Sequence, residues 1–215
     1  MARKKYLRKI KKFFRRSSIK RNAFLLGVFG LLVIVSWGVM TQRTTIPQTA
    51  YTPLLEVIAE GESKGNYNAY FSSVANKDII FTHMTINDVL KWQEDFVKAG
   101  NASSAVGRYQ IIRPTLLGLV KELKLTGNEL YDETMQNRLA VMLMERRGSI
   151  DFIKNELSAE DFAHQLSKEW AALPRVIGEM PESSFYAGDG LNRSLIDSQT
   201  SLTAVQKFKD RANTK

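Results

Sequence analysis

A run of eighteen uncharged residues, 23–40, divides the chain into parts that must fold separately. As a helix rising about 1.5 Å per residue, it would be about 27 Å long, close to the roughly 30 Å hydrocarbon core of a bilayer. It has no polar face, which argues against a buried core helix. A cleaved signal peptide is the closer alternative, because Ser36 and Gly38 are suitably spaced, but the run exceeds the usual ~7–15 apolar residues. We therefore expect an N-terminal single transmembrane helix at residues 23–40.

The positive charge of the chain is concentrated before this run. The net charge is +9, yet residues 1–21 hold eleven Lys and Arg and no acidic residue. The other residues carry 20 basic against 22 acidic side chains, so the body of the protein is not basic and a nucleic-acid-binding body is disfavoured. Only residues 1–21 have the charge to bind anionic lipid or nucleic acid.

The charge asymmetry also predicts an orientation. The positive-inside bias places the N-terminus inside an inner membrane or virion membrane and residues 41–215 on the periplasmic or outer side. The predicted domains are a basic cytoplasmic or virion-interior tail (1–22), a membrane anchor (23–40), a polar linker (41–50) and a globular domain (51–215). The chain has no cysteine, which excludes disulfides and Cys-ligated metals.

The apolar pattern of the globular domain is mainly helical. Helices are expected at residues 51–59 (ended by Gly61), 85–97, 114–123, 132–147, 158–172 and 201–211. The most strand-like stretch is 66–84, and 178–192 is rich in Gly, Pro and Ser and is predicted to be a loop. The fold class predicted is mostly α with one small β element.

Two short motifs carry the chemistry. Glu62 lies in residues 58–63 (IAEGES), and residues 107–110 (GRYQ) follow about 45 positions later. Cleavage of a glycosidic bond needs a carboxylic acid that is still protonated near neutral pH. Glu62 follows an apolar helix, where free carbonyls and burial both raise a carboxyl pKa. Glu60 is the rival acid, but residues two apart point to different sides of a helix, so at most one faces a cleft.

Together these motifs resemble the lysozyme-like superfamily of lytic transglycosylases and goose-type lysozymes, in particular the lambda-type phage lysozymes. The resemblance covers roughly residues 52–212 and includes 169–174 (EWAALP), where packing of Trp170 is the alternative to a ligand contact. It implies an α+β lysozyme-like domain in which Glu62 is catalytic. The residues implied to bind the sugar are Ser63, Arg108, Tyr109, Gln110 and Tyr186.

The implied activity is that of a membrane-anchored lytic transglycosylase that cuts MurNAc–GlcNAc bonds of peptidoglycan, with one Glu as acid and then base. No cofactor or metal is implied. A hydrolase would need a second carboxylate, for which Asp78, Glu94 and Asp95 are available. Three settings fit: a virion component, an anchored phage lysis enzyme, or a cellular enzyme working with secretion-complex proteins. The non-enzymatic alternative is an anchored structural or adaptor protein that binds glycan, which would have no use for a protonated Glu62.

Overall fold

The computed structural model describes residues 46–214, which are mainly helices joined by irregular loops. The mostly helical fold class is therefore confirmed. The α-helices are α2 (Thr52–Ser63), α3 (Ile86–Lys98), α4 (Arg113–Glu122), α5 (Glu133–Arg146), α6 (Ser149–Ile153), α7 (Ala159–Ser167) and α8 (Ser198–Asn213). Two short 3-10 helices, η1 (Gln48–Tyr51) and η2 (Phe81–His83), precede α2 and α3.

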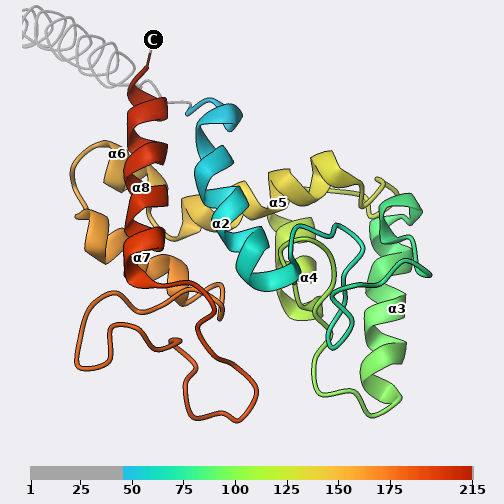
Figure 1. The fold of residues 1–215 in the computed structure, drawn as a ribbon. Coiled ribbons are helices and arrows are strands. Elements are labelled where there is room, and N and C mark those ends of the chain that lie inside the picture. The colour runs from blue at the N-terminus through green and yellow to red at the C-terminus, as the bar shows by residue number, and fades with distance from the viewer. Residues whose placement is uncertain (1–45, 215) are drawn as a thin grey trace, which may run out of the picture. The chain divides into compact units, whose positions relative to one another are not determined.

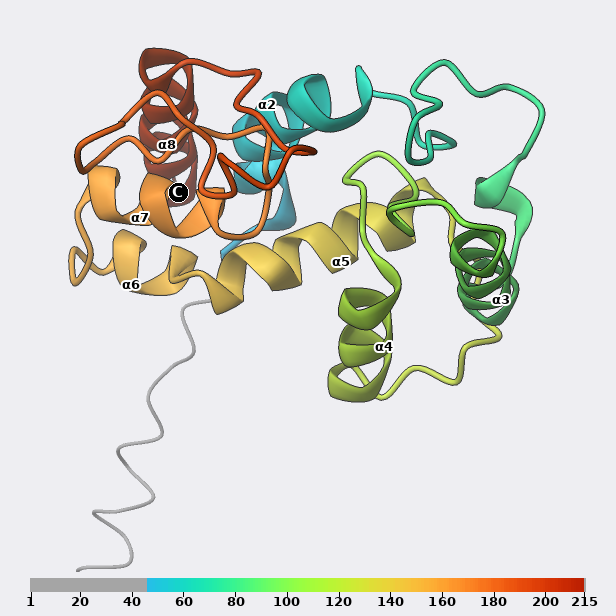
Figure 2. The same cartoon turned by 90° about the horizontal axis from the view of Figure 1, so that it is seen from below.

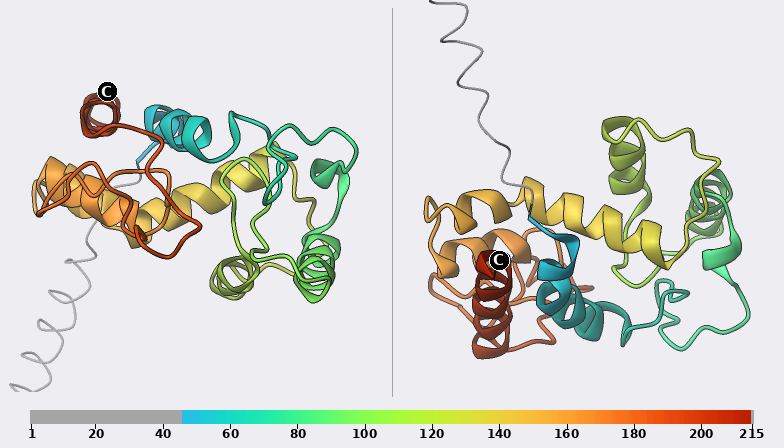
Figure 3. Two further views of the ribbon diagram at one scale, coloured as in Figure 1. Left: turned by 60° about the horizontal axis from the view of Figure 1, so that its bottom comes forward. Right: turned by 90° about the horizontal axis from the view of Figure 1, so that it is seen from above.

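Helix α5 runs through the middle of this unit and connects two groups of helices. Figure 1 shows α8 beside α2, with α6 and α7 nearby and α3 and α4 at the other end. In the view from below, α5 crosses between these groups (Figure 2), and the two further views show the same separation (Figure 3). One sequence motif lies at the end of α2 in the first group, and the other lies in the loop between α3 and α4 in the second group.

Aromatic side chains hold the first helical group together. The ring of Tyr51, the last residue of η1, lies 4.7 Å from that of Phe208 in α8, centroid to centroid. Phe152 and Phe162 stack at 5.1 Å and extend the same cluster into α6 and α7. All four side chains are buried. Each fully buried aromatic ring contributes roughly 1.5–3 kcal/mol, so the end of the described chain is fastened to its beginning.

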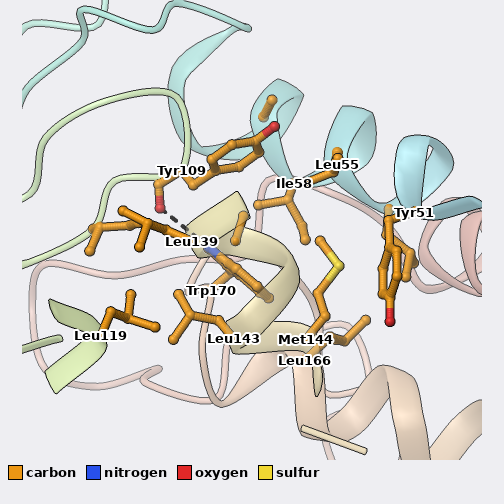
Figure 4. Packing of buried hydrophobic residues seen from close by; sticks show 14 of the residues in the cluster. Tyr51, Leu55, Ile58, Tyr109, Leu119, Leu139, Leu143, Met144, Leu166 and Trp170 are labelled. Atoms are coloured by element: carbon orange, nitrogen blue, oxygen red, sulfur yellow. Dashed lines mark hydrogen bonds between the residues drawn. The ribbon is translucent and has the colours of Figure 1, made fainter. Parts of the chain in front are cut away.

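The core continues along α5 toward the motif loops. Leu139, Leu143 and Met144 of α5 belong to the same buried cluster as Ile58 of α2 and Trp170 (Figure 4). The Trp170 indole N–H donates to the carbonyl oxygen of Tyr109 at 3.3 Å, the dashed line in Figure 4. Trp170 is thus a buried packing residue, one of the two roles expected for it, and it ties the 107–110 loop to the core.

Several helix starts agree with the sequence. Thr85 and Asp88 form a reciprocal capping box at α3, and the side chains of Asp132 and Ser158 cap α5 and α7. Helix α7, however, ends at Ser167, five residues before the predicted end at 172. Beyond this helix end, residues 168–172 form a separate, irregular segment next to the cleft described below.

The expected strand at residues 66–84 is wrong. Within residues 46–214 the β structure consists of isolated bridges, among them Tyr70 with Ser73 and Tyr70 with Val106. The buried side chain of Asn76 donates to the carbonyls of Asn68 and Ile79 at 2.6 and 2.8 Å. Side-chain hydrogen bonds thus satisfy the backbone groups that a strand ladder would otherwise pair, and the segment folds as an irregular loop.

None of the helices in residues 46–214 has the length and apolar character needed to cross a membrane. This finding corrects the predicted localisation as a single-pass inner-membrane or virion-membrane protein with its N-terminus inside. The segment on which that prediction depended, 23–40, and the basic segment 1–21 lie outside the described residues. The folded unit described here begins at Ile46.

Candidate active site

Glu62 lies in the last turn of α2, which is longer than the sequence predicted. The helix passes through Gly61 and ends at Ser63, with Lys64 in the left-handed conformation as its C-cap. A Cβ atom at position 61 would lie 2.7 Å from the Cβ of Ala172. Gly61 therefore allows close approach between α2 and the 168–172 segment, rather than ending the helix. At this contact the Ala172 N–H donates to Oε1 of Glu62 at 3.0 Å.

A cleft of about 590 Å³ lies next to this contact, and Glu62 is part of its wall. The loop that was expected to be a strand contributes Tyr70, Phe71, Ser72 and Val74 to the wall. The loop before α4 contributes Ala102, Ser103, Ala105, Tyr109, Gln110, Ile111 and Ile112, and α4 contributes Thr115. The remaining side comes from Leu143, Arg147, Lys168, Glu169, Trp170, Ala171, Tyr186, Leu191 and Asn192. The cleft is thus assembled from segments far apart in the sequence.

Burial raises the pKa of Glu62 from an ordinary value of 4.5 to about 7, and the hydrogen bond from Ala172 opposes this shift. Burial thus favours the protonated form of Glu62, which can donate a proton, nearer to neutral pH than in an exposed carboxyl group. Glu60 is in a different environment. It is exposed, it pairs with Lys64 at 2.7 Å, and it is not among the cleft residues. Of the two rival acids, only Glu62 can reach a ligand in the cleft.

The 107–110 loop reaches the cleft by a tight turn. Gly107 has φ +85°, and a Cβ there would lie 2.4 Å from Oε1 of the buried Gln136 side chain. That same oxygen accepts a hydrogen bond from the Arg108 N–H at 2.8 Å. Gln110 follows at φ +46°, with its Nε2 donating to the Gly107 carbonyl at 2.9 Å, and it lines the cleft. The side chain of Gln136 holds this turn, but Gln136 lies in neither of the two motifs, and nothing in the sequence identifies it as a residue of the site.

Ser63 and Arg108 join the two motifs but do not line the cleft. The Ser63 hydroxyl is buried and donates to the Arg108 carbonyl at 2.7 Å. The Arg108 guanidinium donates to Glu56 at 2.6 Å and lies 4.8 Å from the centroid of the Tyr67 ring. These contacts fix the 107–110 loop against α2. The structure thus places both residues outside the cleft wall, and their direct contact with sugar stays a prediction from the resemblance.

The two predicted tyrosines differ in exposure. Tyr109 is only 2% exposed, and its hydroxyl donates to Asn137 at 2.6 Å. Its ring therefore forms part of the cleft floor rather than an open stacking surface. Tyr186 is 39% exposed, lines the cleft, and donates its hydroxyl to the Lys168 carbonyl at 2.7 Å. Of the two rings, Tyr186 is the one accessible to a sugar.

The second carboxylate of the cleft is one that the sequence did not single out for this role. Asp78, Glu94 and Asp95 do not line the cleft, whereas Glu169 does. Oε2 of Glu169 accepts hydrogen bonds from Nε and Nη2 of Arg147 at 2.9 and 2.7 Å. The only sequence signal for Glu169 was its place at the start of the 169–174 segment. Within residues 46–214, no cluster of three or more His, Cys, Asp and Glu side chains could hold a metal ion.

Comparison with known proteins identifies the family of the chain. The family model described as Endolysin matches residues 52–186, more than half of the chain, and this range includes Glu62, the 107–110 loop and Tyr186. A search of curated proteins and a search of solved structures found no match. Endolysins are lysozyme-like enzymes of the phage type that cleave peptidoglycan, which fits a cleft with a protonated carboxylic acid. The chain therefore belongs to the endolysin family of peptidoglycan-cleaving enzymes.

Proposed function

We propose that this chain is a lytic transglycosylase that cleaves MurNAc–GlcNAc bonds, with Glu62 as its only acid and base. The observation that carries the proposal is the contrast between the two carboxyl groups of the cleft. Glu62 has a pKa raised to about 7 and forms no ion pair with a cation of residues 46–214, whereas Glu169 is held by the Arg147 guanidinium. One group is suited to donating a proton near neutral pH, and the other is committed to an ion pair.

The reaction would proceed in two proton transfers. Protonated Glu62 donates to the glycosidic oxygen, the bond from that oxygen to C1 of muramic acid breaks, and GlcNAc leaves with a free hydroxyl. The resulting Glu62 carboxylate then takes the proton of the muramic C6 hydroxyl while O6 bonds to C1. The product is a 1,6-anhydro end. The proton count closes, since Glu62 ends as it began, and no water is consumed.

The other cleft residues would hold the sugar in place. Gln110 offers an amide that donates and accepts hydrogen bonds, and Tyr186 offers an exposed ring. Such contacts orient the muramic ring for attack by O6 without activating a water molecule. We assign Ser63, Arg108 and Tyr109 to positioning, because their polar groups are bonded to protein atoms: Ser63 to the Arg108 carbonyl, Arg108 to Glu56 and Tyr109 to Asn137.

A retaining or inverting hydrolase would need a second carboxylate that is free to act as nucleophile or base. Glu169 is the remaining carboxylate in the wall of the cleft, and its interaction with Arg147 occupies it. The biological setting we propose is a phage enzyme that opens the host wall during lysis or genome delivery, with other virion proteins as neighbours. No observation on the described residues favours the glycan-binding adaptor.

Product analysis tests the proposal. Sacculi are digested with the full-length chain, the products are reduced with borohydride, and the muropeptides are analysed by mass spectrometry. Anhydro ends resist reduction and should be about 20 Da lighter than reduced hydrolytic ends, because water is not added and two hydrogens are not gained. The Glu62→Gln variant is the control for contaminating enzymes. Reducing muramic ends as the main product would show that the enzyme is a hydrolase.

A further inference from the structure

The side of the cleft formed by residues after α5 and α7 has a surplus of positive charge. The charged side chains in the wall of the cleft are Glu62, Arg147, Lys168 and Glu169. Arg147 and Glu169 neutralise each other through their 2.7 Å ion pair. The Lys168 ammonium contacts only the neutral Oε1 of Gln165 at 3.3 Å, and no salt bridge joins Lys168 to a carboxylate within residues 46–214. When Glu62 is protonated, as an acid must be before it donates, the cleft wall therefore carries one cation in excess.

Arg175, which does not line the cleft, adds a second positive charge at the aromatic ring that Lys168 also contacts. Lys168 Nζ and Arg175 Cζ each lie 5.7 Å from the centroid of the Phe185 ring. The Arg175 guanidinium donates to the carbonyls of Ser184 and Phe185, both at 3.1 Å, and it forms no salt bridge with a carboxylate of residues 46–214. Two cations held at one aromatic ring repel each other, and Lys168 is itself only half-exposed. An incoming anion would relieve this repulsion.

The proposed substrate carries such an anion beside the scissile bond. Every N-acetylmuramic acid has a lactyl arm, which ends either in its own carboxylate or in a stem peptide that bears carboxylates. N-acetylglucosamine has no carboxylate. A cation in the cleft wall would therefore distinguish muramic acid from N-acetylglucosamine, and a charge-assisted hydrogen bond is the contact that best does so.

We propose that Lys168 binds a carboxylate carried on the lactyl arm of N-acetylmuramic acid, supported by the positive charge of Arg175. The site selects acidic, muramic-acid-containing glycan over neutral chitin-type glycan. This inference rests on the proposed function only in that the cleft accepts a peptidoglycan strand. It adds a specificity-determining residue that acts on binding and takes no part in the proton transfers of Glu62.

A binding experiment in an inactive background tests the site without depending on the chemistry of cleavage. The full-length Glu62→Gln protein is compared with versions that also carry Lys168→Gln, Lys168→Arg or Lys121→Gln. Lys121 is an exposed residue of α4 that does not line the cleft, so Lys121→Gln removes the same charge from elsewhere. Binding is measured to peptide-bearing glycan, to glycan stripped of peptide, and to chitin oligomers.

Lys168→Gln should weaken binding to muramic glycan about five- to tenfold, the effect of losing one partly exposed charge-assisted hydrogen bond. Lys168→Arg should retain most of the binding to muramic glycan, because it keeps the positive charge. Lys121→Gln should change this binding less than about twofold, and the binding of every variant to chitin oligomers should also change less than about twofold. The difference should shrink at about 1 M salt, where the screening length is about 3 Å. A loss confined to stripped glycan identifies the lactyl carboxylate, and a loss confined to peptide-bearing glycan identifies the stem peptide.

Equal effects of Lys168→Gln and Lys121→Gln on muramic glycan would overturn this inference and leave the proposed function intact. An equal loss on chitin oligomers would also overturn it, because chitin has no carboxylate. Conversely, cleavage that survives Glu62→Gln would overturn the proposed function, and the charge preference could still be measured. Thermal unfolding of each variant shows whether a loss of binding follows from a loss of folding.

Discussion

The end of α2 and the segment 168–172 each bring a glutamate into the same cleft, in opposite surroundings. Burial of the Glu62 carboxyl raises its pKa to about 7, and the one backbone N–H that it receives, from Ala172, only partly opposes this shift. Glu169 receives two hydrogen bonds from a guanidinium. The chemical difference between identical side chains is therefore made by their neighbours, since burial favours the neutral form and a cation favours the charged form.

The two regions also depend on each other. They touch where Gly61 meets Ala172, and the Ala172 carbonyl in turn accepts hydrogen bonds from the N–H groups of Leu195 and Ile196 at 2.9 and 3.1 Å. The acid on α2 is thus oriented by the segment that carries the ion-paired glutamate. The comparison can be tested by changing one region at a time.

The largest effect is expected from Glu62→Gln. The amide keeps the shape of the side chain but cannot donate a proton, so the rate of sacculus lysis should fall by roughly 10²–10⁴. Glu60→Gln is the matched control, because Glu60 lies two residues away, is exposed and pairs with Lys64. Turbidity loss of purified sacculi measures both. Lysis abolished by Glu60→Gln but not by Glu62→Gln would reverse the assignment.

The same variant should be more stable than the parent at alkaline pH. Because the pKa of Glu62 is about 7 in the folded chain and ordinarily 4.5, the folded state binds more protons between these values. The free energy of unfolding therefore falls as pH rises through this window. Glu62→Gln removes the penalty and should add up to about 3 kcal/mol at pH 8. Little should change near pH 4.

Urea denaturation of the two proteins at both pH values measures this difference. A gain of the same size at pH 4 and pH 8 would mean that the ionisation of Glu62 is not its cause.

Gly61→Ala tests the contact between the two regions. The added methyl group would lie 2.7 Å from the Cβ of Ala172 and 3.1 Å from Cγ1 of Ile196, so the segment 168–172 must move. Overpacking of this kind costs about 1–3 kcal/mol, and lysis should fall with it, because the Ala172 N–H leaves Glu62. Gly118→Ala is the control. It also lies within a helix, α4, but meets nothing within 4 Å, so it should stabilise by about 0.5–1 kcal/mol.

The smallest effect is expected from Glu169→Gln. Arg147 loses its charged partner, but both side chains retain access to water, so stability should fall by only about 1 kcal/mol. Lysis should decrease less than tenfold, and the products should still end in anhydro-muramic residues. A loss as deep as that of Glu62→Gln would instead identify Glu169 as the second carboxylate of a hydrolase.

Local features of the fold were predictable because their causes are local. The capping side chains of Thr85, Asp132 and Ser158 bond to backbone N–H groups three residues ahead, and the helices begin there as expected. The strand predicted at residues 66–84 failed because Asn76 bonds to backbone groups up to eight positions away. The predicted end of the helix at Gly61 was wrong, because Gly61 is required by its contact with Ala172, 111 residues later in the chain.

By itself, the sequence determined the helical class of the domain and identified Glu62 and Gln110 as candidate site residues. These inferences depend on periodicity, helix caps and short motifs, all of which are local in the sequence. The tertiary structure alone decided that Glu62 receives its hydrogen bond from Ala172, that Glu169 is bound by Arg147, and that Ser63 and Arg108 support the loop from outside the cleft. Electrostatic environment depends on distance in space, and residues far apart in the chain acquire their distances only when it folds.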